Sequence, residues 1–373
     1  MIKPILMATL AAATLAGCGS AQLAAAPEVQ TVAPAPQPYA AIVERHRLAH
    51  GFNGVVLVGQ GTQVLALVST GVADAEAGLP VTAQTRFETG SMSKWVAAIV
   101  VMRLVDRGLL SLDAPIARYL PTYRPDTGAR LTLRHLMSHS SGVPNDIAAA
   151  RKADPSVATQ VMTQAEAVRR YASGDLAFAP GTQWDYSHSN WLIVQAIAEQ
   201  VGGKPYPQLV RDELTGPLGL EGSGIFSGDS AQVPGMARGY SALKPGPQAR
   251  INPIPAYMAM AGGFYSTAPD LLRLLQGVLA GPLLSPEARR ALMTTQMPDQ
   301  HYALGGRIRT ETIAGQPREI AWEDGSNGGF RAIARRVLAD DHSVVVLNNS
   351  SDDHLLLGQM ADELLAQSYA AAP

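Results

Sequence analysis

The residues of this chain whose types and spacing could do chemistry begin with Ser91 and Lys94, three places apart in the stretch FETGSMSKW. A serine hydroxyl is a poor nucleophile at neutral pH unless a nearby base takes its proton. On a helix, residues three apart share a face with β-carbons about 5–6 Å apart, so Lys94 can reach Ser91. Lys94 can act as the base only where burial or a neighbouring positive charge favours loss of its own proton. The pair therefore indicates a serine nucleophile with a lysine partner.

Ser91 also stands where a long apolar helix is expected to begin, directly after Gly90. The free amides and the positive dipole end of a helix N-terminus favour developing negative charge, so the Ser91 amide could help to hold an oxyanion. A plainer interpretation is that Ser91 or Ser93 caps the helix, since serine is a preferred N-cap residue. The S-x-x-K spacing alone is frequent by chance, and the local sequence leaves both interpretations open.

A third candidate is Tyr186, which follows a Pro-Gly loop in PGTQWDYSHSNW, just before a predicted helix. A tyrosine phenol beside a cationic lysine can be drawn towards phenolate and act as a general base or as a proton relay to the leaving group. The alternative is a half-buried tyrosine whose hydroxyl binds the backbone. The local sequence around Tyr186 is compatible with either a catalytic or a structural role.

The elements that must position these residues follow from the hydrophobic pattern. Two β-branched runs within residues 51–74, separated by GQGTQ, predict a hairpin. From about residue 92 to 260 the pattern becomes helical, with helices ending at Gly108 and Gly202. FRAIARRVLADDHSVVVLNNS predicts a second antiparallel strand pair, and HLLLGQMADELLAQSY predicts a closing helix. The first and last strands can share one sheet only if the helical region forms a lobe beside it.

Five segments then carry a resemblance along the chain: FETGSMSKWVAA, GLLSLDAPIARYLP, LTLRHLMSHSSGVP, PGTQWDYSHSNW and AGGFYSTAPDLLRLL. In this order, and from about residue 40 to the end, the chain resembles the serine β-lactamase-related family. That family includes class C β-lactamases, D-alanyl-D-alanine carboxypeptidases and esterases of the family VIII type. Ordered matching of this kind is much more specific than S-x-x-K.

The resemblance implies an α/β (α+β) fold of the β-lactamase/transpeptidase type. An antiparallel sheet would be flanked by helices, with an inserted all-helical lobe and the active site in the cleft between them. The resemblance also implies that Ser91 attacks a carbonyl to form an acyl-enzyme, while Lys94 and Tyr186 share proton transfer. The oxyanion hole would combine the Ser91 amide with a backbone amide on a strand near the end of the chain.

The second motif of the family is commonly Tyr-x-Asn, whereas here Tyr186 and Ser187 are followed by His188, with Asn190 two residues on. Histidine can still donate a hydrogen bond, so we expect His188 and Asn190 to bind substrate. Protonation of His188 would also make activity near Tyr186 depend on pH.

The third motif departs further, because the family usually places Lys or His, then a small residue, then Gly. Here Glu323, Asp324 and Gly325 take those positions, followed by Ser326, and we expect Glu323, Gly325 and Ser326 to bind substrate. An acidic pair would repel a substrate carboxylate by roughly 1–4 kcal/mol at a few ångströms in a partly solvated cleft. This favours neutral or cationic esters and amides over β-lactams and D-alanyl peptides. Two alternatives stay open: a solvated acidic turn, and a positive group restored by Arg331.

The beginning of the chain is typical of a bacterial lipoprotein. MIKPILMATLAAATLAGCGS has a short basic region, an apolar region too short to span a bilayer, and then small residues that end at Cys18. Leu15-Ala16-Gly17-Cys18 resembles a lipobox, which implies cleavage before Cys18 and acylation of its sulfur. Gly19 after Cys18 favours a periplasm-facing outer-membrane location. The expected divisions are a signal peptide at 1–18, an Ala/Pro-rich tether at 19–38 and a catalytic domain at 39–373, with the sheet at about 39–88 and 262–373 and the helical lobe at about 89–261.

Composition excludes several other classes. The chain has 29 Lys and Arg against 31 Asp and Glu, without a basic stripe, so nucleic acid is not an expected partner. Cys18 is the only cysteine, so no thiol remains for a disulfide, a thiolate metal site or a cysteine nucleophile. His135 and His139 are four apart but lack the acidic residue of zinc-protease helices, so we expect neither a metal nor another cofactor.

Three functions remain, and the first is a lipid-anchored serine hydrolase that cleaves a small ester or amide through Ser91, most like an esterase. The second is a penicillin-interacting D-alanyl-D-alanine carboxypeptidase or a class C-like β-lactamase. The third is a non-catalytic envelope binding protein, suggested by His188 and Glu323. Retention of Ser91, Lys94 and Tyr186 together argues against this last possibility.

Overall fold

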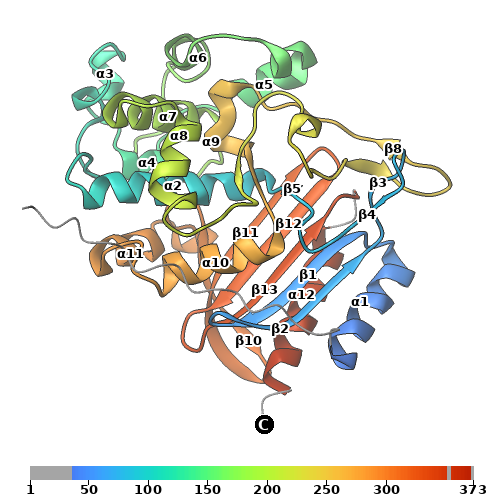
Figure 1. Ribbon diagram of the computed structural model, residues 1–373. Coiled ribbons are helices and arrows are strands. Elements are labelled where there is room, and N and C mark those ends of the chain that lie inside the picture. The colour runs from blue at the N-terminus through green and yellow to red at the C-terminus, as the bar shows by residue number, and fades with distance from the viewer. Residues whose placement is uncertain (1–35, 351–353, 371–373) are drawn as a thin grey trace, which may run out of the picture.

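The centre of the molecule is a six-stranded antiparallel sheet in the order β10-β11-β12-β13-β1-β2 (Figure 1). The computed structural model describes residues 36–350 and 354–370, so Cys18, the predicted signal peptide and almost all of the predicted tether lie outside it. β1 pairs with β13, and the first and last strands therefore share one sheet, as the sequence predicts. The strands are β1 (Gly54–Gln60), β2 (Gln63–Thr70), β10 (Arg307–Ile313), β11 (Gln316–Asn327), β12 (Phe330–Val337) and β13 (His342–Asn348).

Both faces of this sheet are covered, because alternate side chains of a strand point to opposite sides. Val56 of β1 belongs to an apolar cluster with α1 (Gln37–His50) and α12 (His354–Ala370). Val55 belongs to a larger cluster on the other face, which includes α10 (Ala268–Leu279) and the helical region. The result is a helix–sheet–helix arrangement, in which α12 is the closing helix that the sequence predicts.

Helix α1 differs from the prediction, in which the folded body begins near Tyr39 and its first regular elements are strands. Its buried residues Tyr39, Ile42, Val43 and His46 nevertheless follow helical spacing, and Gly51 ends the helix in a left-handed conformation with φ 77°. The signal was therefore present in the sequence, but a short one-sided stripe beside a Pro-rich segment did not stand out.

A lobe of helices and loops lies beside the sheet (Figure 1). Most of the residues between β5 (Phe87–Glu88) and β9 (Phe264–Ser266) form this lobe. Its central helix α2 (Ser93–Asp106) buries every side chain from Ser93 to Met102. The other helices are α3 (Pro125–Gly128), α4 (Leu133–Met137), α5 (Asp146–Ala153), α6 (Gln164–Tyr171), α7 (Ser189–Gly202), α8 (Tyr206–Val210) and α9 (Ala259–Gly262), with α11 (Pro286–Met293) after α10. The short strands are β3 (Val72–Asp74), β4 (Leu79–Pro80), β6 (Gly224–Ile225), β7 (Tyr240–Ala242) and β8 (Gln248–Ala249).

The small sheet β5-β9-β6 connects this lobe to the start of α2. It fixes the two ends of the lobe side by side, directly before the turn that carries Ser91. Across residues 36–350 and 354–370, none of the helices has the length and apolar character needed to cross a membrane.

Candidate active site

Ser91 lies in a single 3₁₀ turn, Gly90–Met92, between β5 and α2. The neighbouring Ser93 holds this turn: its hydroxyl donates to Gly90 O at 2.6 Å and accepts from the backbone N–H of Phe264 at 2.9 Å. The Ser91 side chain makes no capping hydrogen bond to the helix. The capping interpretation therefore does not apply to Ser91, and its hydroxyl is available for chemistry.

The Ser91 hydroxyl faces both of the other predicted catalytic residues. Tyr186 OH lies 2.9 Å from Ser91 Oγ, and Lys94 Nζ lies 3.3 Å from it. Lys94 is 1% exposed and also donates to Ala261 O at 2.6 Å, which fixes its amine at the base of the site. Lys94 Nζ sits 5.0 Å from the centroid of the Tyr186 ring. The three side chains thus form one contiguous group, suited to moving a proton away from Ser91.

The edge of β11 passes directly beside the Ser91 turn. β10 pairs with β11 only as far as Trp322, so the last residues of β11 have no strand on that side and meet the turn instead. A β-carbon at Gly325 would collide with Thr89 O and lie 2.6 Å from Ser91 N. One at Gly90 would lie 2.5 Å from Ser326 N. Two glycines therefore bring the Ser91 and Ser326 amides close together, as an oxyanion hole requires.

A cleft of about 360 Å³ opens above these groups between the lobe and the sheet. Ser91, Ser326 and His188 line it, together with two cations of α5, Arg151 and Lys152. The remaining lining residues are uncharged: Gly90, Ala148, Pro155, Ala158, Asn252, Ile254, Met258, Ala261, Gly262 and Asn327. A second groove, of about 1020 Å³, lies on the far side of the lobe around Tyr123 and Arg169, and Ser91, Lys94 and Tyr186 are not among its lining residues.

Tyr186 is positioned by His139, which is fully buried. The two rings stack with centroids 4.3 Å apart and an interplanar angle of 26°. His139 O accepts from the N–H of Asp185 at 3.0 Å, and its Nδ1 accepts from the N–H of Ser187 at 3.0 Å, so both neighbours of Tyr186 are held. Burial and the Lys94 cation keep the pKa of His139 well below its ordinary value, so the ring stays neutral and Nδ1 remains an acceptor.

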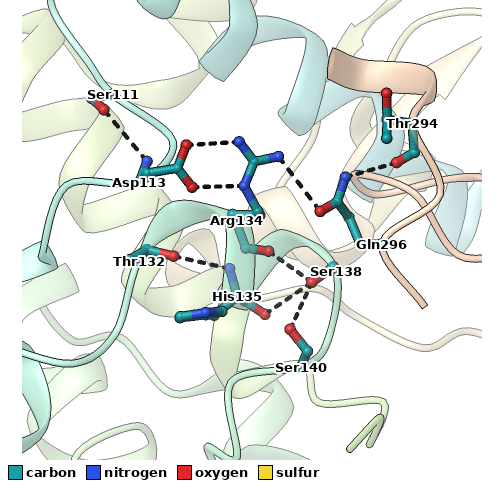
Figure 2. A network of polar contacts seen from close by, with 9 residues as sticks. All are labelled: Ser111, Asp113, Thr132, Arg134, His135, Ser138, Ser140, Thr294 and Gln296. Carbon is teal, nitrogen blue, oxygen red and sulfur yellow. Dashed lines mark hydrogen bonds and ion pairs between the residues drawn. The ribbon is translucent and has the colours of Figure 1, made fainter. Parts of the chain in front are cut away.

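His139 adopts a left-handed backbone with φ 59°, a conformation that costs about 1–3 kcal/mol for a residue other than glycine. Figure 2 shows how the preceding helix α4 is anchored to hold it there. Arg134 binds Asp113 through two hydrogen bonds of 2.7 Å, Thr132 caps the N–H of His135, and Ser138 Oγ donates to Arg134 O at 2.7 Å. These contacts fix the end of α4, from which His139 turns towards Tyr186.

His188 lies in the cleft, as predicted, but it does not act as a pH switch. Asn145 Oδ1 accepts from the N–H of His188 at 3.0 Å, so its amide nitrogen must face His188 Nδ1, at 3.3 Å. This makes Nδ1 the acceptor and places the ring proton on Nε2. Burial, Lys94 and Arg151 hold the pKa of His188 well below its ordinary value. The expected pH dependence was therefore wrong: His188 is a neutral donor over the neutral range, much like the amide it replaces.

Asn190 does not contact the cleft, and this expectation is corrected. Its side chain is fully buried, with Oδ1 accepting from Ser141 Oγ at 2.6 Å and Nδ2 lying 3.3 Å from His139 Nδ1. Asn190 therefore lies behind Tyr186 and holds the loop that carries His139. A sequence position two residues after His188 on a helix points inward, away from substrate.

Glu323 is also buried and does not line the cleft, so the predicted repulsion of a carboxylate is corrected. Its Oε1 accepts from the N–H of Arg307 at 3.0 Å and packs against Gly306, where a side chain would collide with it. Burial raises the pKa of Glu323 well above its ordinary value, which reduces its negative charge near neutral pH. Asp324 faces Arg307 and His354, each at 3.8 Å. The acidic pair is thus compensated within the fold.

The remaining third-motif residues divide between packing and binding. Gly325 supplies the close approach to the Ser91 turn, and Ser326 is exposed in the cleft. Arg331 does not take the place of the missing cation at the cleft wall, since its Nη1 donates to the carbonyls of Gly328 and Phe330.

The structure brings several residues to the site that the sequence pattern does not indicate. His139 had been considered only as half of a metal pair, although it stands in the quoted LTLRHLMSHSSGVP segment. Asn145, Arg151 and Asn252 come from loops and a helix end with no local chemical pattern. Within residues 36–350 and 354–370, His, Cys, Asp and Glu do not gather in a group of three or more that could hold a metal ion.

Comparison with known proteins identifies the family of this chain. The Beta-lactamase family model matches residues 40–366. The chain is 30% identical over 266 residues to "Esterase EstB" of Burkholderia gladioli, which covers 63% of this chain and 67% of that protein. Among solved structures, a class C beta lactamase from Rhodobacter sphaeroides has 26% identity and a TM-score of 0.69, covering 90% of this chain and 100% of the other. A penicillin binding protein from Bacillus halodurans has 22% identity and a TM-score of 0.75, covering 90% and 99%.

The chain therefore belongs to the β-lactamase family and is a serine hydrolase. The predicted fold, an antiparallel sheet flanked by helices with an inserted helical lobe, is confirmed.

A covalent probe will test which serine is the nucleophile. A fluorophosphonate should label the purified chain once, at Ser91, and Ser91→Ala should abolish labelling because no other hydroxyl faces both Lys94 and Tyr186 among the described residues. Ser326→Ala is the matched control in the same cleft and should still be labelled. Peptide mapping by mass spectrometry identifies the labelled residue. Unchanged labelling of Ser91→Ala would show that Ser91 is not the nucleophile.

The close approach of β11 is tested by Gly325→Ala. The new methyl group must displace the Thr89 carbonyl or the Ser91 turn, so we expect a loss of about 1–3 kcal/mol in the free energy of unfolding and much slower probe labelling. Gly246→Ala is the control, since a β-carbon there meets no heavy atom within 4 Å, and it should stay within about 0.5 kcal/mol. Denaturant titration measures both, and equal stabilities would contradict the packing argument.

Proposed function

We propose that this serine hydrolase is an esterase, held at the cell envelope by a lipid on Cys18. The observation that carries the esterase proposal is the convergence of Tyr186 and Lys94 on the Ser91 hydroxyl at 2.9 and 3.3 Å. One further fact favours an ester over a β-lactam: a relative with 30% identity is called an esterase.

The proposed reaction moves one proton outward from Ser91 and later returns it. Tyr186 acts as the base in its phenolate form, which the positive charge of Lys94 stabilises. Ser91 Oγ attacks the ester carbonyl while its proton passes to the Tyr186 oxygen. The carbonyl oxygen becomes an oxyanion held by the amides of Ser91 and Ser326. The bond to the alcohol then breaks, Tyr186 protonates the leaving oxygen, and an acyl-enzyme remains. Water, deprotonated by the same group, attacks the acyl carbon and releases the acid and free Ser91.

One observation favours a second candidate, a β-lactamase or D-alanyl-D-alanine carboxypeptidase activity. Both substrates carry a carboxylate, and the two charged residues that line the cleft, Arg151 and Lys152, are positive. The likeness to the Rhodobacter sphaeroides class C beta lactamase supports the same alternative.

A substrate comparison separates the two activities. We expect p-nitrophenyl acetate and butyrate to be hydrolysed with a kcat/KM at least about 100-fold above that for a chromogenic cephalosporin, and Tyr186→Phe to lower ester kcat by about 10²–10⁴-fold through loss of proton transfer. Ser91→Ala gives the background rate. Rapid acylation of Ser91 by a penicillin without ester turnover would reverse the ranking.

The lipid anchor rests on the lipobox-like sequence before Cys18, which lies outside the described residues. In a bacterial host, the full chain should sediment with membranes and incorporate labelled palmitate. Cys18→Ser should lose both, because a hydroxyl replaces the sulfur that is acylated, while a version that starts at residue 36 keeps ester hydrolysis. Palmitate incorporation that persists in Cys18→Ser would exclude this anchor.

A further inference from the structure

The charged residues that line the cleft above Ser91 are all positive, and the roles of Ser91, Lys94 and Tyr186 do not account for them. Arg151 and Lys152 line it from the end of α5, and in the described part of the chain no Asp or Glu lines it. Lys152 is exposed, whereas Arg151 is partly buried in the wall. A cation held in a partly desolvated wall is unfavourable unless an anion or several acceptors compensate it.

The acceptors of Arg151 are all uncharged. Its Nη2 donates to Asn252 Oδ1 at 2.9 Å and to Pro253 O at 3.0 Å. Its Nη1 faces the sulfur of Met258 at 3.7 Å, and a thioether is only a weak acceptor. One edge of the guanidinium is therefore fixed, while the other lacks a strong acceptor.

A chain of two amides, the buried Asn327 and the partly buried Asn252, holds this guanidinium in one orientation. Asn327 Nδ2 donates to Glu88 Oε2 at 2.5 Å, which turns Asn327 Oδ1 towards Asn252 Nδ2, also at 2.5 Å. Asn252 Oδ1 is then left to accept from Arg151. Ser230 Oγ donates to Glu88 Oε1, and the Asn327 amide nitrogen donates to Glu88 Oε2, so the Glu88 carboxyl sets the direction of the amides in the chain. The Arg151 side chain is thus held in a fixed orientation before a ligand binds.

Arg151 also lies in the same space as the reacting serine. Arg151 and His188 line the same cleft as Ser91. Ser91 and Arg151 line one continuous cleft of about 360 Å³. A small substrate whose carbonyl lies at Ser91 can therefore reach Arg151 with a second group.

We propose that the natural substrate is an ester that carries a carboxylate, bound by Arg151 with Lys152 at the cleft mouth. This inference rests on the proposed esterase function and names its substrate class. An ionised acceptor completes the open edge of the guanidinium with charge-assisted hydrogen bonds, which are about twice as strong as neutral ones. The cation absent from the third motif is thus supplied from the opposite, helical wall of the cleft.

Ester turnover tests the proposal with matched pairs of substrates. p-Nitrophenyl hemiglutarate carries its carboxylate on the acyl side, and 4-acetoxybenzoate carries it on the leaving side; p-nitrophenyl butyrate and methyl 4-acetoxybenzoate are their neutral counterparts. We expect one acid to exceed its neutral counterpart about tenfold or more in kcat/KM. Arg151→Gln should abolish this preference mainly through KM, and Arg151→Lys should partly rescue it.

Two controls separate local binding from general charge and from folding. Lys152→Gln, an exposed position, should weaken the same preference by a few-fold, while Arg290→Gln on α11 removes an equal charge outside the cleft and should not. Far-ultraviolet circular dichroism and thermal unfolding confirm that each variant is folded. A preference that survives Arg151→Gln, or equal rates on acids and neutral esters in the wild type, overturns the proposal.

A binding measurement keeps this test distinct from the esterase proposal. Boronic acids add reversibly to a serine hydroxyl without turnover, so 3-carboxyphenylboronic acid and phenylboronic acid can be compared by calorimetry. We expect about tenfold tighter binding of the carboxylate form, lost in Arg151→Gln. This result with no ester hydrolysis would reject the esterase function and keep the carboxylate site; equal affinities, or no binding of either compound, would overturn the site.

Discussion

The site depends on one close contact, the passage of the β11 edge against the turn that holds Ser91. Gly325 permits it, since any side chain there would meet Thr89 O and the Ser91 amide, and Gly90 permits it from the other side. The contact joins a strand from the end of the chain to a turn near its beginning. The Ser91 and Ser326 amides lie near each other only because these backbones can approach so closely.

Around this contact the protein places ionisable groups in an environment that suppresses charge. His139 and His188 are kept neutral by burial and by nearby cations, while burial raises the pKa of Glu323 and brings that of Glu88 to about 7. Neutral rings can stack on Tyr186 or donate to a substrate without competing with Lys94 for charge. The acids beneath the site fix hydrogen bonds instead of repelling substrate.

The charge of the cleft shows how a motif can mislead when it is interpreted without its surroundings. Glu323 replaces a cation in the sequence, which predicts a cleft hostile to carboxylates. In the fold its side chain turns away to the N–H of Arg307, and the charges that reach the cleft come from Arg151 and Lys152. Which way a side chain points at a strand edge depends on what packs against it, and local sequence does not contain that information.

The sequence by itself predicted the sheet shared by the first and last strands, the helical lobe between them, and the candidate catalytic residues Ser91, Lys94 and Tyr186. Hydrophobic periodicity and short spacings involve residues close together in the chain, so they can be recognised from the sequence alone. Only the tertiary structure decided that His139 holds Tyr186 and that Asn190 faces inward. It also decided that an amide chain from Glu88 aims a guanidinium into the cleft. Those roles depend on contacts between residues that lie, for example, 48 or 239 positions apart, which spacing along a chain cannot predict.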